Sequence, residues 1–200
     1  ELGGKSAFVV LADADLDIAA GVAALMYRNA GQVCLAGTRF LIHESVAAEF
    51  RQRMHAYVQR LKVGDPRDPS TEIGPLIHRR QFERVSGFVE RALKAGAESF
   101  WGGAKHAAGE LYFQPTMLAP RSSSDEIVQN EVFGPVLVWQ TFSSDEQAIA
   151  MANDTQYGLA GSCFGELEHA TRVADQIRTG MVWVNSFFLR DLNAPFGGIR

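Results

Sequence analysis

Short apolar runs alternate with longer amphipathic stretches along most of this chain. Such alternation is typical of α/β folds, in which buried strands are joined by helices. Ala7-Phe8-Val9-Val10-Leu11 is one of these runs and predicts a buried strand. Predicted strands cover residues 7–11, 39–42, 98–101, 112–118, 136–142 and 181–185.

The stretches between these runs predict helices with recognisable ends. Aspartates at positions 13, 15 and 17 offer N-caps and a negative first turn to a helix that runs to about Tyr27. Ser45 is expected to cap the next helix, which has an apolar face through residue 61. Further helices are predicted over 81–95, 145–153 and 168–177, a loop over 64–69, and an exposed turn over 104–110. Because the sequence contains no repeat or linker, we expect one domain.

Composition limits the classes of partner. The net charge is −4 and no run of Lys and Arg occurs, so neither nucleic acid nor an anionic membrane is an expected partner. No apolar run approaches the roughly 18 residues that a membrane span needs. Cys34 and Cys163 lie far apart, and reduced thiols are favoured over a disulfide. A cytoplasmic location is therefore expected.

Cys34 lies among glycines and small residues in the segment Asn29-Ala30-Gly31-Gln32-Val33-Cys34-Leu35-Ala36-Gly37-Thr38-Arg39. These neighbours suit a tight backbone that presents a thiolate, the strongest nucleophile among side chains near neutral pH. The Cys34 N–H is a candidate donor to a developing oxyanion. Val33 and Leu35 are expected to shape the mouth of a substrate pocket. Taken alone, the segment is equally consistent with a buried, inert cysteine.

A carboxylate stands at the start of the chain, in Glu1-Leu2-Gly3-Gly4-Lys5-Ser6. A carboxylate serves as a general base when burial raises its pKa towards neutrality. Gly3 and Gly4 leave room for a substrate or cofactor to approach. Without other motifs, an exposed surface glutamate is the simpler interpretation of Glu1.

A third segment, Asn130-Glu131-Val132-Phe133-Gly134-Pro135, combines a carboxylate, an aromatic ring and a Gly-Pro turn. Such residues suit a ribose and the face of a nicotinamide ring. By itself the segment indicates only a helix end that turns into a strand.

The first two segments together resemble the aldehyde dehydrogenase superfamily, whose motifs Glu-Leu-Gly-Gly-Lys and Gly-Gln-x-Cys-x-Ala-Gly-Thr-Arg they match. The resemblance implies a three-layer α/β sandwich with a mostly parallel sheet between helices. It implies that Cys34 attacks an aldehyde, that hydride passes to NAD or NADP, and that Glu1 activates the water that hydrolyses the thioester. It also places Glu131 on the nicotinamide ribose, Phe133 against the ring, and Gly3 beside the cofactor.

The resemblance extends along nearly the whole chain, through residues 63–77, 152–160 and 184–198. The chain contains no Gly-x-Gly-x-x-Gly run, which a dinucleotide site normally needs. In this family the cofactor domain precedes the Glu-Leu-Gly-Gly motif, and a later tail carries a strand used in oligomer assembly. We therefore expect residues 1–200 to be the catalytic domain alone, inactive in isolation, and the intact protein to be a homo-oligomer, a dimer or a tetramer.

Residues 185–192 give the best indication of the aldehyde. In the family this stretch borders the substrate tunnel, which assigns substrate contacts to Asn185 and Phe188. Arg190 can clasp a substrate carboxylate through two parallel hydrogen bonds. Arg190-Asp191-Leu192 resembles the dehydrogenases of hydroxy- and aminomuconic semialdehydes. An ion pair between Arg190 and Asp191 is the competing interpretation.

Three rival functions remain. A dehydrogenase that transfers the acyl group to coenzyme A generally dispenses with a base such as Glu1. A non-catalytic relative is disfavoured by the joint presence of Cys34, Glu1, Glu131 and Phe133. A cysteine hydrolase needs a histidine partner, and the five histidines show neither that arrangement nor the spacing of metal ligands.

Overall fold

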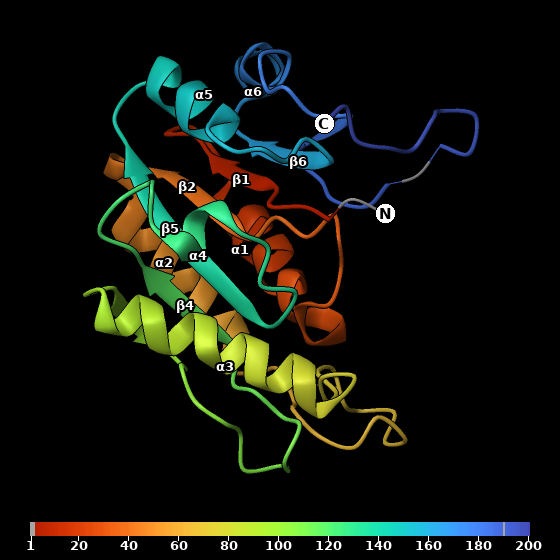
Figure 1. Cartoon of the computed structure of the whole chain (residues 1–200). Coiled ribbons are helices and arrows are strands. Elements are labelled where there is room, and N and C mark those ends of the chain that lie inside the picture. Colours follow the sequence, from red (N-terminus) through yellow and green to blue (C-terminus); the bar gives the residue numbers. More distant parts are fainter. Residues whose placement is uncertain (1–2, 190) are drawn as a thin grey trace.

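A seven-stranded sheet forms the centre of the protein (Figure 1). The computed structural model describes residues 3–189 and 191–200. The strand order is β3-β4-β5-β2-β1-β6-β7, and every neighbouring pair is parallel except β3 and β4. The strands are β1 (Ala7–Val10), β2 (Arg39–His43), β3 (Glu98–Trp101), β4 (Thr116–Ala119), β5 (Val136–Phe142), β6 (Ala160–Phe164) and β7 (Met181–Val184).

Helices lie on both sides of this sheet. Figure 1 shows α1 and α2 on one side and α5 and α6 on the other. A seven-residue 3₁₀ segment (Leu25–Gly31) continues α1, and α3 packs against α4. The helices are α1 (Leu16–Ala24), α2 (Glu44–Val58), α3 (Arg79–Lys94), α4 (Glu126–Gln129), α5 (Asp145–Asn153) and α6 (Leu167–Ala174). The predicted α/β sandwich is confirmed.

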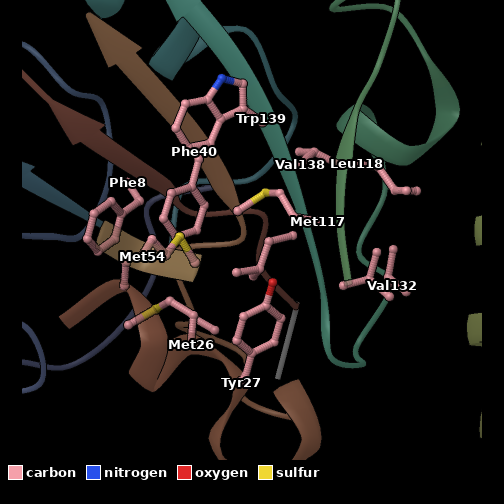
Figure 2. Packing of buried hydrophobic residues seen from close by; sticks show 14 of the residues in the cluster. Phe8, Met26, Tyr27, Phe40, Met54, Met117, Leu118, Val132, Val138 and Trp139 are labelled. Atoms are coloured by element: carbon pink, nitrogen blue, oxygen red, sulfur yellow. The ribbon is translucent and has the colours of Figure 1, made fainter. Parts of the chain in front are cut away.

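The larger core cluster joins the sheet to α1 and α2 (Figure 2). Phe8 and Phe40 come from adjacent strands and stack with ring centroids 4.6 Å apart. Tyr27 is buried and donates a hydrogen bond to the carbonyl oxygen of Thr116, 3.0 Å away. Burial raises the pKa of Tyr27 far above its usual value, so the phenol stays neutral. The tyrosine thus fixes the 3₁₀ segment after α1 to β4.

Several predicted elements have different ends. The helix expected to reach Tyr27 is α-helical only to Ala24, and the strand expected over 112–118 begins at Thr116. His43, not Ser45, caps α2, because its ring accepts a hydrogen bond from the Ser45 N–H. The strand β6 was not predicted. Its sequence, Ala-Gly-Ser-Cys-Phe, lacks the β-branched residues that mark strands, although all five positions are buried.

Candidate active site

The loops that lead into the parallel strands meet at one end of the sheet, where these strands begin. Gly3 and Gly4 precede β1, Cys34 precedes β2, Glu131 precedes β5, and Leu159 precedes β6. Parallel strands begin at the same edge, so these four loops converge there. The sheet topology therefore brings together residues that are up to 156 positions apart.

An unusual backbone conformation precedes Cys34. Asn29, Ala30 and Gly31 all have positive φ, at 53°, 53° and 66°. Asn29 Nδ2 donates to the Gln32 carbonyl oxygen, and Gln32 Nε2 donates to the Asn29 carbonyl oxygen. These reciprocal bonds stabilise a strained turn, which ends two residues before Cys34.

Two glycines allow the loops to approach closely. A Cβ atom at Gly4 would lie 2.1 Å from the carbonyl oxygen of Cys34. A Cβ atom at Gly31 would lie 2.0 Å from the carbonyl oxygen of Gly134, in the Gly-Pro turn before β5. Both distances are too short for any side chain, so the three motifs pack backbone to backbone.

The two cysteines differ in environment, and both are described residues that form no disulfide. Cys163 is fully buried in β6, where burial raises the pKa of its thiol to about 12. Cys34 is partly exposed and lines a cavity of about 270 Å³. The other lining residues are Gly3, Leu159, Phe196, Gly197, Gly198 and Arg200. Of the two thiols, Cys34 is therefore the one placed to meet a small molecule.

Val33 and Leu35, the neighbours of Cys34 in sequence, belong to an apolar cluster beside it. Leu35 is 3% exposed and forms an apolar cluster with Leu159 and Ala160, against which Val33 and Cys34 pack. Trp183 and Phe187 contact the same cluster. The wall beside the cysteine is thus apolar, and a pocket-shaping role for Val33 and Leu35 stays a prediction.

The Glu131 carboxylate lies directly against the Gly3–Gly4 segment. Its Oε1 accepts a hydrogen bond from the Gly4 N–H, at 3.1 Å, and its Oε2 lies only 2.7 Å from where a Cβ of Gly3 would be. Glycine at position 3, with φ of 75°, therefore makes the space that this carboxylate occupies. The structure brings Glu131, Gly3 and Cys34 together, as the sequence motifs suggested.

Side chains from two other elements fix the backbone around Glu131. Arg84 of α3 donates to the Glu131 carbonyl oxygen at 2.7 Å, and the Tyr157 hydroxyl accepts from the Glu131 N–H at 3.4 Å. Gln81 Nε2 donates to the carbonyl oxygens of Val132 and Phe133, at 3.1 and 2.7 Å. Phe133 has a φ of 57°, which these bonds help to maintain. No local pattern had marked Gln81, because its role depends on where α3 packs.

Arg39 is a buried residue whose place the sequence only partly indicated. Its guanidinium donates to the carbonyl oxygens of Lys5, Met151 and Ala152, at 2.8, 2.8 and 2.7 Å. Met151 and Ala152 belong to the last turn of α5, and the Met151 carbonyl oxygen also accepts from the N–H of Asp154, at 3.3 Å. Burial lowers the pKa of Arg39 to about 10, which still leaves it charged at neutral pH. It joins β2, α5 and the segment before β1.

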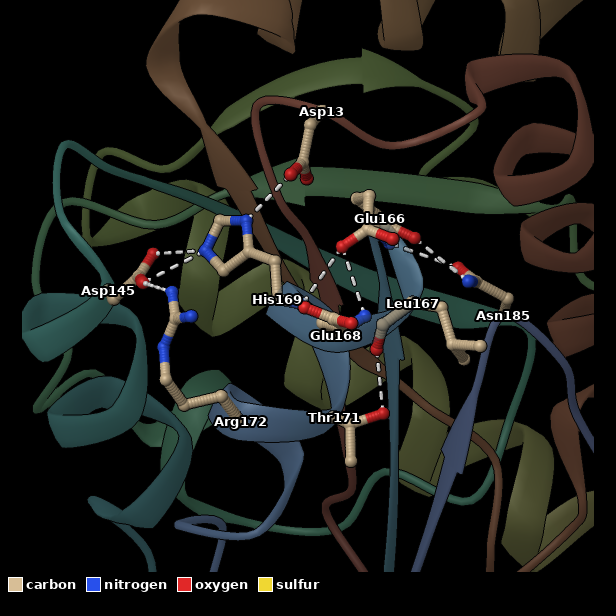
Figure 3. Close-up of polar contacts among 10 residues, drawn as sticks. Asp13, Asp145, Glu166, Leu167, Glu168, His169, Thr171, Arg172 and Asn185 are labelled. Carbon is tan, nitrogen blue, oxygen red and sulfur yellow. Dashed lines mark hydrogen bonds and ion pairs between the residues drawn. The ribbon is translucent and has the colours of Figure 1, made fainter.

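The predicted substrate residues are less concentrated. Asn185 follows the carboxyl end of β7, at the opposite ends of the strands from Cys34. Its Oδ1 accepts from the Gly165 N–H and its Nδ2 donates to the Gly165 carbonyl oxygen (Figure 3). Phe188 is 45% exposed and stacks on Phe187. Substrate contacts of Asn185 and Phe188 stay predictions. Glu1 and Arg190 lie outside the described residues.

Within residues 3–189 and 191–200, no three His, Cys, Asp or Glu side chains gather in a way that would hold a metal ion. None of the helices described there has the length and apolar character to cross a bilayer.

Comparisons with known proteins agree on one family. The model of the aldehyde dehydrogenase family matches residues 1–200. The chain is 39% identical over 202 residues to a succinate semialdehyde dehydrogenase of Acinetobacter baylyi, covering all of this chain and 42% of the relative. It is 40% identical over 207 residues to a 2-hydroxymuconic semialdehyde dehydrogenase of Pseudomonas putida, covering all of this chain and 43% of that relative.

A solved structure gives the same result. Betaine aldehyde dehydrogenase of Staphylococcus aureus in complex with NAD⁺ superposes with a TM-score of 0.94 at 36% identity, covering all of this chain and 41% of that one. The chain thus spans less than half the length of the proteins that it matches. Because the family model matches all 200 residues of this chain, the chain belongs to the aldehyde dehydrogenase family.

Proposed function

We propose that this chain is the thiol-bearing catalytic domain of an enzyme that oxidises an aldehyde to a carboxylic acid with NAD or NADP. The observation that carries the proposal is the cavity in which Cys34 and Gly3 lie side by side, with the Glu131 carboxylate against Gly3. The cofactor-binding domain that completes the site lies outside residues 1–200 in this proposal.

The residues at the cavity fit a nicotinamide nucleotide. Gly3 lines the cavity without a side chain, and Glu131, which packs against Gly3, offers carboxylate oxygens to ribose hydroxyls. Phe133, two residues further along, is the proposed partner of the nicotinamide ring, and Gln81 donates a hydrogen bond to its carbonyl oxygen. The bound nicotinamide supplies the hydride acceptor.

The chemistry of the chain itself begins at Cys34. Its thiolate forms a C–S bond to the aldehyde carbon, and the N–H of Cys34 is the proposed donor to the resulting oxyanion. Loss of hydride from this thiohemiacetal leaves a thioester on Cys34. The apolar wall of Val33, Leu35 and Leu159 limits access of water on one side of the sulfur.

Hydrolysis of the thioester is the task proposed for Glu1. A water loses its proton to the carboxylate, its oxygen forms the new C–O bond, and the C–S bond breaks to restore the Cys34 thiolate. The assignment rests on the place of Glu1 in the Glu-Leu-Gly-Gly segment, two residues before a glycine that lines the cavity.

The test of this function compares the two cysteines. In this chain, iodoacetamide should alkylate Cys34 roughly 100-fold faster than Cys163, as read by peptide mass spectrometry, because burial holds Cys163 as a neutral thiol. In a longer protein that supplies the cofactor domain, Cys34→Ala should lower aldehyde oxidation by about 10⁴-fold or more, while Cys163→Ala keeps it. Turnover retained by Cys34→Ala would refute the assignment.

We propose a carboxylated semialdehyde as the substrate, with Arg190 as its carboxylate partner. Support comes from the Arg190-Asp191-Leu192 sequence and from two relatives named for semialdehydes. Arg190→Ala should raise the KM for succinate semialdehyde about tenfold or more, because a charged hydrogen-bonded pair is lost. The KM for propanal should not change. Arg178→Ala, which removes an exposed arginine before β7, is the control, and equal effects on both aldehydes would remove the inference.

We also propose that the intact enzyme is a cytoplasmic homo-oligomer, a dimer or a tetramer. The support is an apolar surface at the outer edge of the sheet, beside β7. Leu189, Leu192 and Phe196 lie there and are 72%, 93% and 54% exposed. Apolar side chains gathered in this way mark interaction surfaces in soluble proteins.

A further inference from the structure

Lys5 is a buried amine to which the proposed mechanism gives no task. It directly follows Gly4, whose N–H binds the Glu131 carboxylate. The residue is 1% exposed, and its Nζ has no hydrogen-bond partner among residues 3–189 and 191–200. The crevice beside Lys5, Arg39 and Tyr157 has no room for a water molecule. An ammonium group placed there loses its hydration without a compensating hydrogen bond.

Charged and titratable groups from three other segments lie near Lys5. Arg39 of β2 lines the same crevice, with its guanidinium already committed to three backbone carbonyls. Tyr157 lines the crevice from the loop before β6, and its hydroxyl accepts from the N–H of Glu131, whose carboxylate binds the N–H of Gly4. Cys34 lies across Gly4, whose Cα approaches the Cys34 backbone.

These neighbours act on Lys5 in opposite senses. Burial lowers the pKa of Lys5 to about 7, the charge of Arg39 acts in the same direction, and the charge of Glu131 opposes both. The ammonium form of Lys5 is thus much less favoured than that of an exposed lysine. The negative charge of Glu131 is the influence that favours its ammonium form.

We propose that Lys5 is a proton-binding positioning residue for the Glu131 carboxylate, so that engagement of Glu131 by the cofactor displaces the proton of Lys5 into solvent. Ribose hydroxyls that donate to Glu131 disperse its negative charge, and an oxidised nicotinamide brings a positive charge beside it. Both changes weaken the attraction that keeps Lys5 protonated. By linkage, deprotonation of Lys5 must strengthen NAD⁺ binding by the same factor. The cofactor part of this inference rests on the proposed function.

The Lys5–Glu131 pair can be tested in this chain without cofactor or activity. In protein labelled with ¹³C-lysine, NMR titration of the Cε–Hε signals separates Lys5 from the exposed Lys62, Lys94 and Lys105. The Lys5 signal should titrate near pH 7. The signal is assigned by its absence in Lys5→Met, and circular dichroism confirms that each variant folds.

Glu131→Gln should lower the Lys5 midpoint by about one pH unit, because the opposing charge is removed. The matched control is Glu126→Gln, which removes an exposed carboxylate of α4 that pairs with Arg91 of α3. It should leave the Lys5 midpoint unchanged. A Lys5 midpoint at the ordinary lysine value of about 10.4, or a midpoint that Glu131→Gln does not move, overturns the proposal.

The cofactor linkage needs the longer protein. Calorimetry of NAD⁺ binding at pH 7, in two buffers of different ionisation enthalpy, should detect proton release in the wild type and none in Lys5→Met. Lys5→Met should also bind NAD⁺ about threefold or more tightly than the wild type at pH 6, and equally at pH 8.5. A purely structural role for Lys5 would weaken binding at every pH. Equal proton release by both proteins overturns the linkage, whereas absence of any NAD⁺ binding overturns the proposed function and leaves the NMR result to decide the pair.

Discussion

At the scale of single residues, the site depends on glycines that carry no side chain as much as on the reactive side chains themselves. Cys34, Glu131 and Phe133 could be selected from the sequence because a thiol, a carboxylate and an aromatic ring stand beside glycines. Lys5 and Gln81 could not be selected in this way. A lysine after two glycines gives no sign that it will be buried, and the bonds of Gln81 depend on tertiary packing.

Gly4 offers a direct test of backbone packing at the site. Gly4→Ala should lower the free energy of unfolding by about 1–3 kcal/mol, because the new Cβ would overlap the carbonyl oxygen of Cys34. The rate at which iodoacetamide alkylates Cys34 should change as the loop shifts. The control is Gly21→Ala in α1, where a Cβ would lie 3.7 Å from the Tyr57 ring and helix propensity improves. Chemical denaturation gives the stabilities, and equal stability of Gly4→Ala and wild type would contradict the packing argument.

At the scale of elements, side-chain contacts tie helices to the loop ends of the sheet. His169 of α6 bonds Asp13, in the loop after β1, through Nδ1 at 2.7 Å, and Asp145 of α5 through Nε2 at 2.9 Å (Figure 3). Arg172 also reaches Asp145, at 3.4 Å. The bond to Asp13 and then the bond to Asp145 raise the pKa of His169, so its ring favours the protonated form in the folded protein.

This arrangement predicts a pH-dependent contribution to stability. A histidine whose pKa is raised on folding stabilises the protein fully below its unfolded pKa of about 6.5, and the contribution is lost as pH rises through the folded pKa. His169→Gln should therefore lower the free energy of unfolding by roughly 1 kcal/mol at pH 5.5 and by less at pH 9. His106→Gln, in which the lost ring had accepted a bond from the Ala108 N–H, is the control. A Tm difference for His169→Gln that stays constant between these pH values would exclude the charged bridge.

At the scale of the whole molecule, the sequence indicated an α/β sheet but not at which ends of the strands the site would form. Ligands of open α/β sheets commonly bind beyond the carboxyl ends of the strands. Here Gly3, Cys34 and Glu131 all precede their strands, so the cavity lies at the amino ends. The unpredicted strand β6 contributes to this arrangement, because it pairs with β1 and its entry carries Leu159. Strand order is a long-range property that short motifs do not encode.

The outer edge of the sheet leads to a prediction about the molecule as a whole. Beside β7, Leu189, Leu192 and Phe196 expose apolar surface, and β7 pairs on one side only, with β6, in the described sheet. An open edge bordered by apolar side chains favours association between copies. We expect sedimentation velocity to show self-association of this chain that rises with concentration, and Leu192→Lys to reduce it.

Ile77→Lys is the matched control for that measurement. Ile77 is also strongly exposed, at 73%, but it precedes α3, its N–H donates to Gln32 Oε1, and it is not among the residues of the surface beside β7. A general gain in solubility from an added charge would reduce association equally in both variants. An effect confined to Leu192→Lys would instead assign the association to the β7 edge. A chain that stays monomeric at every concentration would contradict the proposed use of this surface.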